Sequence, residues 1–347
     1  MSKRIQILFF MVVFWLIGLF IYGLVHLNKN IDLDEKKVVS FPKGQAVTIF
    51  FRNLNREGII DDSRWISLYT KLSGKGRAAK AGEYELLPTM SALDVLYLLI
   101  DGKSVQYNVT LVEGHNIKET LKRLKNTKKL KYDLPDDWMA LMPYLGLEGH
   151  PEGRFFPDTY SFTAGTRASE VLARAQVRLE RVLAEEWQKK ADGLPYKNKY
   201  EALIMASIVE KETAAPEERE QIAGVFVRRL EKRMRLETDP TVIYGMGDLY
   251  KGNIRRKDLR KKTPYNTYRI KGLPPTPIAL VGREAIYAAL HPADGEELYF
   301  VAKGDGRHYF SKTLAEHNKA VREYQINKRK KEYRSTPDRP IKSAAAE

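Results

Sequence analysis

The amino-acid sequence predicts an α+β protein with one membrane-spanning helix at its N-terminus and a water-facing bulk. Three observations support this class. An apolar run covers residues 5–27, strand-like and helix-like patterns alternate over residues 38–103 and 104–166, and helical periodicity dominates residues 167–327. With 347 residues, 43% of them hydrophobic and 30% charged, the chain is long enough for two domains with buried cores and charged exteriors.

The apolar run from Ile5 to Leu27 is long enough to cross a bilayer, which takes about 20 residues as a helix. Lys3 and Arg4 precede the run, and acidic residues follow it. The positive-inside rule therefore predicts a cytoplasmic N-terminus at residues 1–4, a single pass through the inner membrane and an extracytoplasmic bulk. A cleaved signal peptide would end in small residues, which Gly23–Leu27 lacks at the required spacing. We expect an uncleaved anchor that contacts membrane lipid.

The chain contains no cysteine and carries a net charge of +15. The lack of cysteine excludes disulfides, thiolate zinc sites and a cysteine nucleophile. Positive charge gathers in Lys251–Lys262 and in the tail, residues 328–347. We interpret the tail as solvated and disordered, whereas an anionic partner and plain solvation are both open for Lys251–Lys262. No phosphate loop, dinucleotide fingerprint or metal-binding histidine spacing occurs, so we expect neither a cofactor nor a metal.

The first water-facing segment, Val38–Lys103, is predicted to be a small α+β unit. Ala81–Leu86 is typical of a turn that leads into a strand. Ser91 is a predicted cap for a helix that ends near Gly102. The segment holds no set of side chains that would carry catalysis.

The rest of the chain is predicted to form a connecting α+β region, residues 104–166, and a larger mixed α/β domain, residues 167–327. The connecting region ends in a structured loop rich in proline and aromatic residues. The larger domain begins with a long helix at about residues 168–190 and includes one late strand, Leu298–Ala302.

The strongest chemical signal lies on the predicted helix Tyr200–Thr213, which carries two glutamates near its end. At 100° per residue, Ile208 shares an apolar stripe with Glu212, whereas Glu210 falls on the opposite, polar side. A carboxylate on an apolar face is desolvated, and the helix C-terminus further favours its protonated form. Glu212 is therefore a candidate proton donor near neutral pH. On periodicity alone, a structural glutamate in an ion pair is an equal alternative.

The residues after this helix are predicted to be structural. Pro216 disfavours continuation of the helix and is well placed as the first residue of the next one. Glu218 and Arg219 would lie on the first turn of that second helix. Their pattern favours an interpretation as surface charge.

Several short motifs occur in an order that resembles one known family, the YceG-like endolytic murein transglycosylases. The resemblance covers nearly the whole chain, although Arg228 and Thr276 depart from residues common in the family. The motifs are Phe156–Tyr160, Ala206–Thr213, Thr238–Gly245, Pro264–Tyr268, Gly272–Pro275, His291–Pro292, Leu298–Val301 and Glu316–Asn318.

The resemblance implies a LysM-like subdomain at residues 38–103, a catalytic domain at residues 167–327 and Glu212 as the catalytic acid. It implies peptidoglycan glycan strands as the substrate, nascent strands whose elongation the cut would terminate, and peptidoglycan synthases as candidate partners. Glu212 would protonate the oxygen that links N-acetylmuramic acid to N-acetylglucosamine, giving an oxocarbenium-like state. The carboxylate would then accept the proton of the sugar's own C6 hydroxyl, whose oxygen attacks C1 to form a 1,6-anhydromuramic end.

Candidate sugar-binding residues lie in two of these motifs. Tyr265, Asn266 and Tyr268 combine aromatic faces, which stack on pyranose rings, with an amide that bonds acetamido groups. Asp239, Thr241 and Tyr244 are weaker candidates for the same reasons. For all six residues the alternative is turn structure and core packing.

Two other functions compete with this interpretation. A non-catalytic, membrane-anchored scaffold that binds peptidoglycan would keep the fold but would not need the intact Glu-Lys-Glu-Thr at residues 210–213. A nucleic-acid-binding protein would explain the charge. The predicted anchor, however, puts the basic surface on the wrong side of the membrane, and no nucleic-acid module is recognisable, so we expect no nucleic-acid partner.

Overall fold

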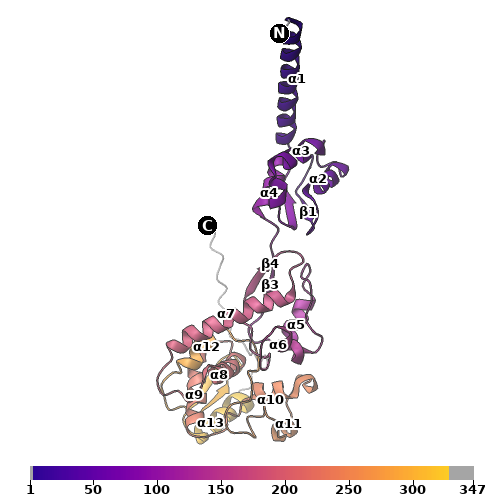
Figure 1. The fold of residues 1–347 in the computed structure, drawn as a ribbon. Helices are drawn as coiled ribbons and strands as arrows, with labels where there is room; N and C mark the ends of the chain where they lie inside the picture. Colours follow the sequence, from indigo (N-terminus) through magenta and orange to yellow (C-terminus); the bar gives the residue numbers. More distant parts are fainter. Residues whose placement is uncertain (1–2, 328–347) are drawn as a thin grey trace. The chain divides into compact units, whose positions relative to one another are not determined.

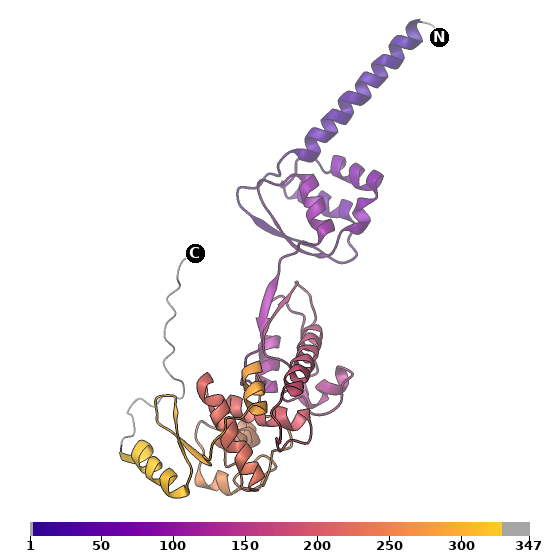
Figure 2. The ribbon, with the colours of Figure 1, turned by 90° about the vertical axis from the view of Figure 1, so that its left-hand side faces the viewer.

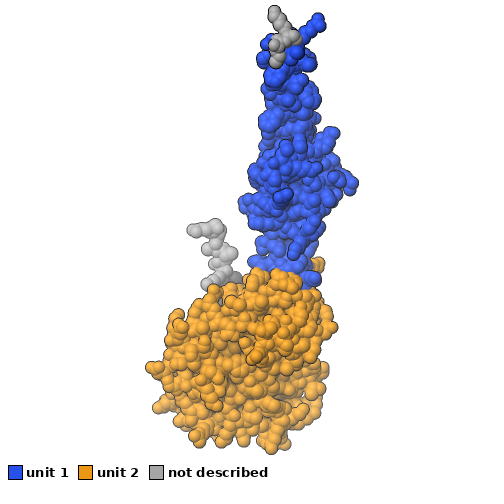
Figure 3. Space-filling view, viewed as in Figure 1, with its two compact units in different colours: residues 1–108, 129–131, 161–166 blue, residues 109–128, 132–160, 167–347 orange. Residues whose placement is uncertain are grey.

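The computed structural model describes residues 3–327, so the tail predicted to be disordered lies outside the described residues. Helices and short antiparallel strands are mixed throughout, as an α+β class requires (Figure 1). The chain forms two compact units, coloured separately in Figure 3. Unit 1 comprises residues 1–108, 129–131 and 161–166, and unit 2 comprises residues 109–128, 132–160 and 167–347.

The predicted apolar helix is present in unit 1 as α1 (Lys3–Asn28). It is long and apolar enough to cross a membrane, and most of its side chains are exposed. Only the last turns of α1 pack against the rest of unit 1, where Leu27 is buried and Tyr22 meets the ring of Trp65 edge-on. A run of exposed apolar side chains that continues into a packed end is the arrangement expected of a membrane anchor.

The remainder of unit 1 is a two-stranded sheet covered by helices. Val39 and Tyr84 face each other across the antiparallel pair, and the buried ring of Phe51 contributes to the core beside them. Ser91 caps α4 through a capping box with Asp94, which confirms the predicted helix start. The elements are β1 (Lys37–Phe41), α2 (Val47–Arg56), α3 (Ser63–Ser73), η1 (Lys75–Ala78), β2 (Gly82–Leu86) and α4 (Ala92–Asp101).

Unit 2 is built mainly of helices and includes the hairpin β5–β6, whereas the short strands β3 and β4 each have residues in both units. Strands β3 and β4 pair with each other, and the antiparallel pair β5–β6 lies beside α13 (Figure 2). The elements of the first half are β3 (Tyr107–Thr110), α5 (Ile117–Lys125), η2 (Trp138–Ala140), α6 (Leu141–Tyr144), β4 (Thr159–Phe162) and α7 (Ala168–Gln188). Those of the second half are α8 (Lys199–Glu212), η3 (Pro216–Glu218), α9 (Arg219–Glu231), α10 (Asp239–Met246), η4 (Gly247–Leu249), α11 (Arg256–Arg260), α12 (Arg283–Leu290), β5 (Tyr299–Ala302), β6 (His308–Ser311), α13 (Leu314–Val321) and η5 (Arg322–Asn327).

Helix α8 runs through the core of unit 2, packed by α7, α9 and α12 (Figure 1). All residues from Ala202 to Val209 are buried, including Ser207, whose hydroxyl donates to the Ile204 carbonyl and accepts from the Ile278 N–H. The prediction of one apolar stripe opposite a polar side is therefore wrong, because neighbouring helices cover α8 on every side. A helix with this burial gives the acids at its C-terminal end a rigid support.

Candidate active site

The carboxyl group of Glu212 lies at the last residue of α8, where the helix ends and the backbone turns extended at Thr213. Its side chain is half-buried, and the Thr238 hydroxyl donates a hydrogen bond to it. Burial raises the pKa of Glu212 to about 7, although the Thr238 bond acts in the opposite direction, and the charge of Asp239 adds to the rise. Glu212 therefore keeps a proton at near-neutral pH and is able to donate it.

Glu212 opens into a cleft of about 570 Å³ within unit 2. The cleft collects residues that are far apart in the sequence, from α8, α9, the start of α10, β5, β6 and α13. Besides Glu212, the polar side chains lining it are Arg229, Glu237, Thr238, Asp239, Tyr268, Tyr299, His308, His317 and Asn318. A wide polar cleft of this kind suits an extended polar polymer better than a small apolar ligand.

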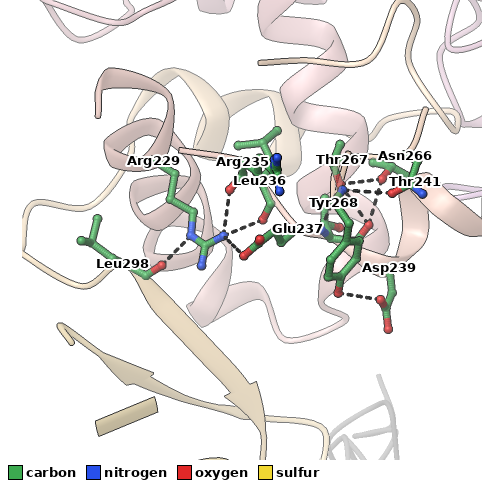
Figure 4. Close-up of polar contacts among 11 residues, drawn as sticks. Arg229, Arg235, Leu236, Glu237, Asp239, Thr241, Asn266, Thr267, Tyr268 and Leu298 are labelled. Carbon is green, nitrogen blue, oxygen red and sulfur yellow. Dashed lines mark hydrogen bonds and ion pairs between the residues drawn. The ribbon is translucent and has the colours of Figure 1, made fainter. Parts of the chain in front are cut away.

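Two sequence-predicted residues, Asp239 and Tyr268, lie in this cleft with Glu212. The Tyr268 hydroxyl donates to the Asp239 carboxylate over 2.8 Å (Figure 4). Burial raises the pKa of the Tyr268 hydroxyl, and the neighbouring Asp239 charge adds to the rise, so this group stays protonated. The cleft thus holds a carboxyl that keeps its proton beside a second carboxylate.

Asn266 and Thr241 are buried outside the lining of the cleft and hold neighbouring loops. The Asn266 amide donates to the carbonyls of Asp258, Leu259 and Lys261, at 3.2, 3.1 and 2.7 Å. The Thr241 hydroxyl bonds the Thr238 carbonyl at 2.8 Å and the Thr267 hydroxyl at 2.9 Å (Figure 4). The polar groups of both side chains are thus bonded within the protein, and their predicted contact with sugar stays a prediction.

Tyr244 and Tyr265 lie apart from the Glu212 cleft, in a second cavity of about 830 Å³. Their rings meet edge-on with centroids 4.9 Å apart, and the Tyr265 hydroxyl is 2.9 Å from that of Thr276. The same cavity contains Glu152, which is 1% exposed and accepts from the Ile117 N–H at 3.0 Å. Burial raises the pKa of Glu152 to about 7. Sequence reasoning missed this carboxyl because nothing local marks it as buried.

The acids and bases after α8 are interior groups, so their interpretation as surface charge is wrong. Glu218 is 7% exposed and Arg219 is 8% exposed. Glu218 accepts from the backbone N–H of His308 at 2.9 Å and meets its Nδ1 at 2.8 Å, which ties η3 to the cleft wall at β6. Pro216 begins η3 as predicted. Only the contact with a strand 90 residues away reveals what Glu218 does.

Glu210 is also buried, contrary to its predicted place on a polar side. Its side chain is 6% exposed, lies 3.8 Å from the Arg219 guanidinium and accepts from the Gly282 N–H at 3.1 Å. Burial raises the pKa of Glu210 and the Arg219 charge opposes that rise. Glu210 therefore links α8, α9 and α12, whereas Glu212 faces the cleft.

Arg229 forms the support of the cleft wall (Figure 4). Its guanidinium donates to the carbonyls of Leu298, Arg235 and Leu236, at 2.6, 2.9 and 3.0 Å, and lies 3.3 Å from the Glu237 carboxylate. These bonds connect α9 to β5 and to the loop before α10. Among residues 3–327, no group of three or more His, Cys, Asp or Glu side chains is placed to hold a metal ion.

A carboxylic acid that keeps its proton near neutral pH, in an open polar cleft beside a second carboxylate, defines a protein equipped for general acid catalysis of the kind that cleaves glycosidic bonds. Residues 39–323 match the YceG-like family, and the chain belongs to that family.

Two relatives of the chain carry the same name. The chain is 32% identical over 338 residues to an endolytic murein transglycosylase from Bacillus subtilis, covering 90% of this chain and 92% of the relative. It is 28% identical to an endolytic murein transglycosylase from Streptococcus pneumoniae, covering 85% of this chain and 60% of the longer relative. A crystal structure of a putative YceG-like protein from Listeria monocytogenes matches with a TM-score of 0.51 and 32% identity, covering 82% of this chain and 99% of that one.

Proposed function

We propose that this protein is an endolytic peptidoglycan lytic transglycosylase with Glu212 as its general acid and base. The observation that carries the proposal is the carboxyl of Glu212, whose pKa of about 7 leaves it a proton to donate in an open cleft. The names of the Bacillus and Streptococcus relatives support the substrate, a glycan of N-acetylmuramic acid and N-acetylglucosamine. Because an endolytic enzyme cuts inside a strand, a cut in a nascent strand would end the growth of that strand at the point of cleavage.

The proposed reaction uses one carboxyl twice. Glu212 gives its proton to the glycosidic oxygen, the bond to C1 of the muramic residue breaks, and the leaving sugar departs with that proton. Positive charge then develops at C1, and the Asp239 carboxylate in the same cleft stabilises it. The Glu212 carboxylate next takes the proton of the C6 hydroxyl, O6 bonds to C1, and a 1,6-anhydromuramic end forms with Glu212 protonated again.

Asp239 also supports a second candidate function, hydrolysis. A second carboxylate in the cleft is the equipment by which ordinary glycosidases activate water or form a covalent intermediate. Mass analysis of the ends released from purified glycan strands distinguishes the two reactions. We expect anhydromuramic ends, and reducing ends in their place would assign the protein to the hydrolases. If the purified protein released neither kind of end, both candidates would fail and the scaffold would remain.

The six predicted sugar-binding residues take different tasks in this proposal. Tyr268 and Asp239, which share the cleft with Glu212, contact the sugar at the cut. Tyr244 and Tyr265 offer aromatic faces in the second cavity for a more distant part of the strand. Asn266 and Thr241 keep the loops in place. Steady-state kinetics separate these roles, because Tyr268→Phe should lower kcat whereas Tyr244→Leu, which removes the aromatic face, should raise KM alone.

We propose that α1 anchors the protein in the inner membrane with residues 1–4 in the cytoplasm and the bulk outside. The Lys3–Arg4 flank and the apolar length of α1 support this orientation. A reporter enzyme fused after Glu347 should therefore be active only when it requires the extracytoplasmic space. Activity of a cytoplasm-dependent reporter at the same position would reverse the orientation, and a mature N-terminus near Asn28 would replace the anchor with a cleaved signal.

We propose that residues 38–103 form a LysM-like subdomain that positions glycan, joined through residues 104–166 to a catalytic domain at residues 167–327. The subdomain has its own core around Phe51 and Tyr84, which supports independent folding. Its removal from the full chain should weaken cleavage in cells while the remaining protein still produces the same ends. Cleavage of glycan by the isolated segment would contradict this division of tasks.

A further inference from the structure

Unit 2 contains a third cavity, of about 550 Å³, that is lined by cationic side chains and is not part of the Glu212 cleft. The basic segment, defined here as residues 251–262, contributes Lys251, Arg255, Lys257 and Lys261 to its lining. One wall is α10, through Val242, Gly245 and Met246. The cavity therefore combines a largely apolar wall with a cationic rim.

The cations of the basic segment have no carboxylate partner among the described residues. The segment holds seven basic side chains and one acid, Asp258, whose carboxylate accepts from the Arg255 backbone N–H at 2.9 Å. By contrast, Arg219, Arg229 and Arg283 elsewhere in unit 2 all form ion pairs. Four of these cations line the cavity against one acid, Asp258, and this excess of positive charge creates a potential that favours an anionic ligand.

The basic cavity is joined to the candidate active site by two features. The buried Asn266 amide holds the carbonyls of Asp258, Leu259 and Lys261, and its own carbonyl oxygen accepts from the Tyr268 N–H at 3.0 Å. The loop that carries Tyr268 is thus bonded directly to the basic segment. An anion held by that segment would be held in a defined position relative to the cleft.

Helix α10 provides the second link, because it lines both sites. Asp239, at its first position, lines the Glu212 cleft, whereas Met246, at its last position, lines the basic cavity. The helix has 8 residues, which corresponds to a length of about 12 Å. A peptide of four residues spans about 13 Å when extended. A short peptide attached to a sugar in the cleft would reach the cavity.

We propose that the basic cavity binds the carboxylates of the stem peptides carried by the glycan strand, so that the enzyme recognises peptide-bearing strands. This inference rests on the proposed function and names a further part of its substrate. The small side chains of a short peptide fit the apolar wall at α10, and its carboxylates fit the cationic rim. The same cations would attract lipid phosphate, but a hollow bonded to the substrate loop suits a chain end better than a flat membrane surface.

The test compares the full-length protein with two triple variants of equal charge. In the first, Lys251, Lys257 and Lys261 are all changed to Gln. In the control, the exposed residues Lys197, Lys199 and Lys232, which form no ion pair among residues 3–327, are changed to Gln. Each protein is assayed on glycan strands that keep their stem peptides and on strands from which an amidase has removed them.

We expect the unmodified and control proteins to cleave peptide-bearing strands with a higher kcat/KM than bare strands. The cavity variant should lose this preference, by roughly tenfold and through KM, because exposed ion pairs are individually weak and three are removed. The preference of the unmodified protein should also shrink as salt is raised. Cleavage of bare strands should be the same in all three proteins.

Three results would overturn the proposal. One is an unchanged preference in the cavity variant, and another is an equal loss on both kinds of strand. The third is tighter binding to vesicles of anionic phospholipid than to vesicles of neutral phospholipid, with this difference lost in the cavity variant, without any strand preference. Sedimentation of strands with the Glu212→Gln protein, with and without the cavity changes, measures the same preference without turnover. The cavity is therefore tested even if the proposed chemistry fails.

Discussion

Replacing Glu212 by glutamine is expected to lower the release of anhydromuramic ends by about 10²- to 10⁴-fold, the usual contribution of general acid–base catalysis. Glutamine keeps the shape of the side chain and its contact with Thr238 but has no proton to donate. The matched control is Glu152→Gln, which changes a carboxyl whose pKa is also about 7 but which lies in another cavity. The control should retain turnover, and equal losses in the two variants would contradict a special role for Glu212.

The pH dependence of the unmodified enzyme should report the same group. With a pKa of about 7, Glu212 loses its proton above neutrality, so kcat/KM should fall about tenfold per pH unit there. A profile that stays flat from pH 6 to about pH 9 would remove Glu212 as the proton donor.

The substitution Glu212→Gln should also raise the stability of the folded protein at alkaline pH. The pKa of Glu212 is higher in the folded protein than its ordinary value of 4.5, so the folded state binds the proton more tightly than the unfolded state does. This tighter proton binding stabilises the folded state fully below about pH 4.5. The stabilisation is lost as the pH rises through about 7. Thermal unfolding should therefore show Glu212→Gln to be more stable than the unmodified protein by ~1–3 kcal/mol at pH 8, a value reduced for partial exposure. The gain should diminish towards acidic pH.

Replacing Arg229 by methionine is expected to destabilise unit 2 by ~3–5 kcal/mol, the cost of breaking one side of a buried charged network. Methionine fills similar space but leaves the carbonyls of Leu298, Arg235 and Leu236 without their donor, and each unsatisfied buried group costs ~1–3 kcal/mol. Turnover should fall as well, since these bonds hold β5 against α9 at the cleft.

Arg235→Met is the matched control for Arg229→Met, because the Arg235 side chain is exposed and only its carbonyl takes part in the network. Its stability should stay within about 0.5 kcal/mol of the unmodified protein. Thermal unfolding of the two variants side by side measures the difference. If they unfolded at the same temperature, the bonds of Arg229 would contribute nothing to the fold.

The contrast between Glu210 and Glu212 shows how far a helical pattern reaches. Periodicity separated the two acids in direction but placed Glu210 on a polar face, whereas in the fold the Glu210 side chain is buried and Glu212 is half-buried and faces the cleft. The difference arises because α7, α9 and α12 cover α8 on all sides. A pattern along one helix reports the directions of its side chains, and the covering elements decide which of those directions meet water.

By itself, the sequence determined those features that depend on neighbours along the chain. The apolar run specifies α1, Ser91 caps α4, and the break before Pro216 leaves Glu212 at the end of α8. Each follows from backbone preferences or from the period of one element, and these are local properties.

Only the tertiary structure decided which side chains accompany Glu212. The Thr238 hydroxyl comes from 26 residues away, and the wall that contains His308 is held by Glu218 across 90 residues. Asn266 shows the same dependence, since its amide would suit a sugar, yet the fold buries it under the basic segment. These partners are chosen by packing of the whole unit, because a buried polar group is stable only where the fold supplies its bonds.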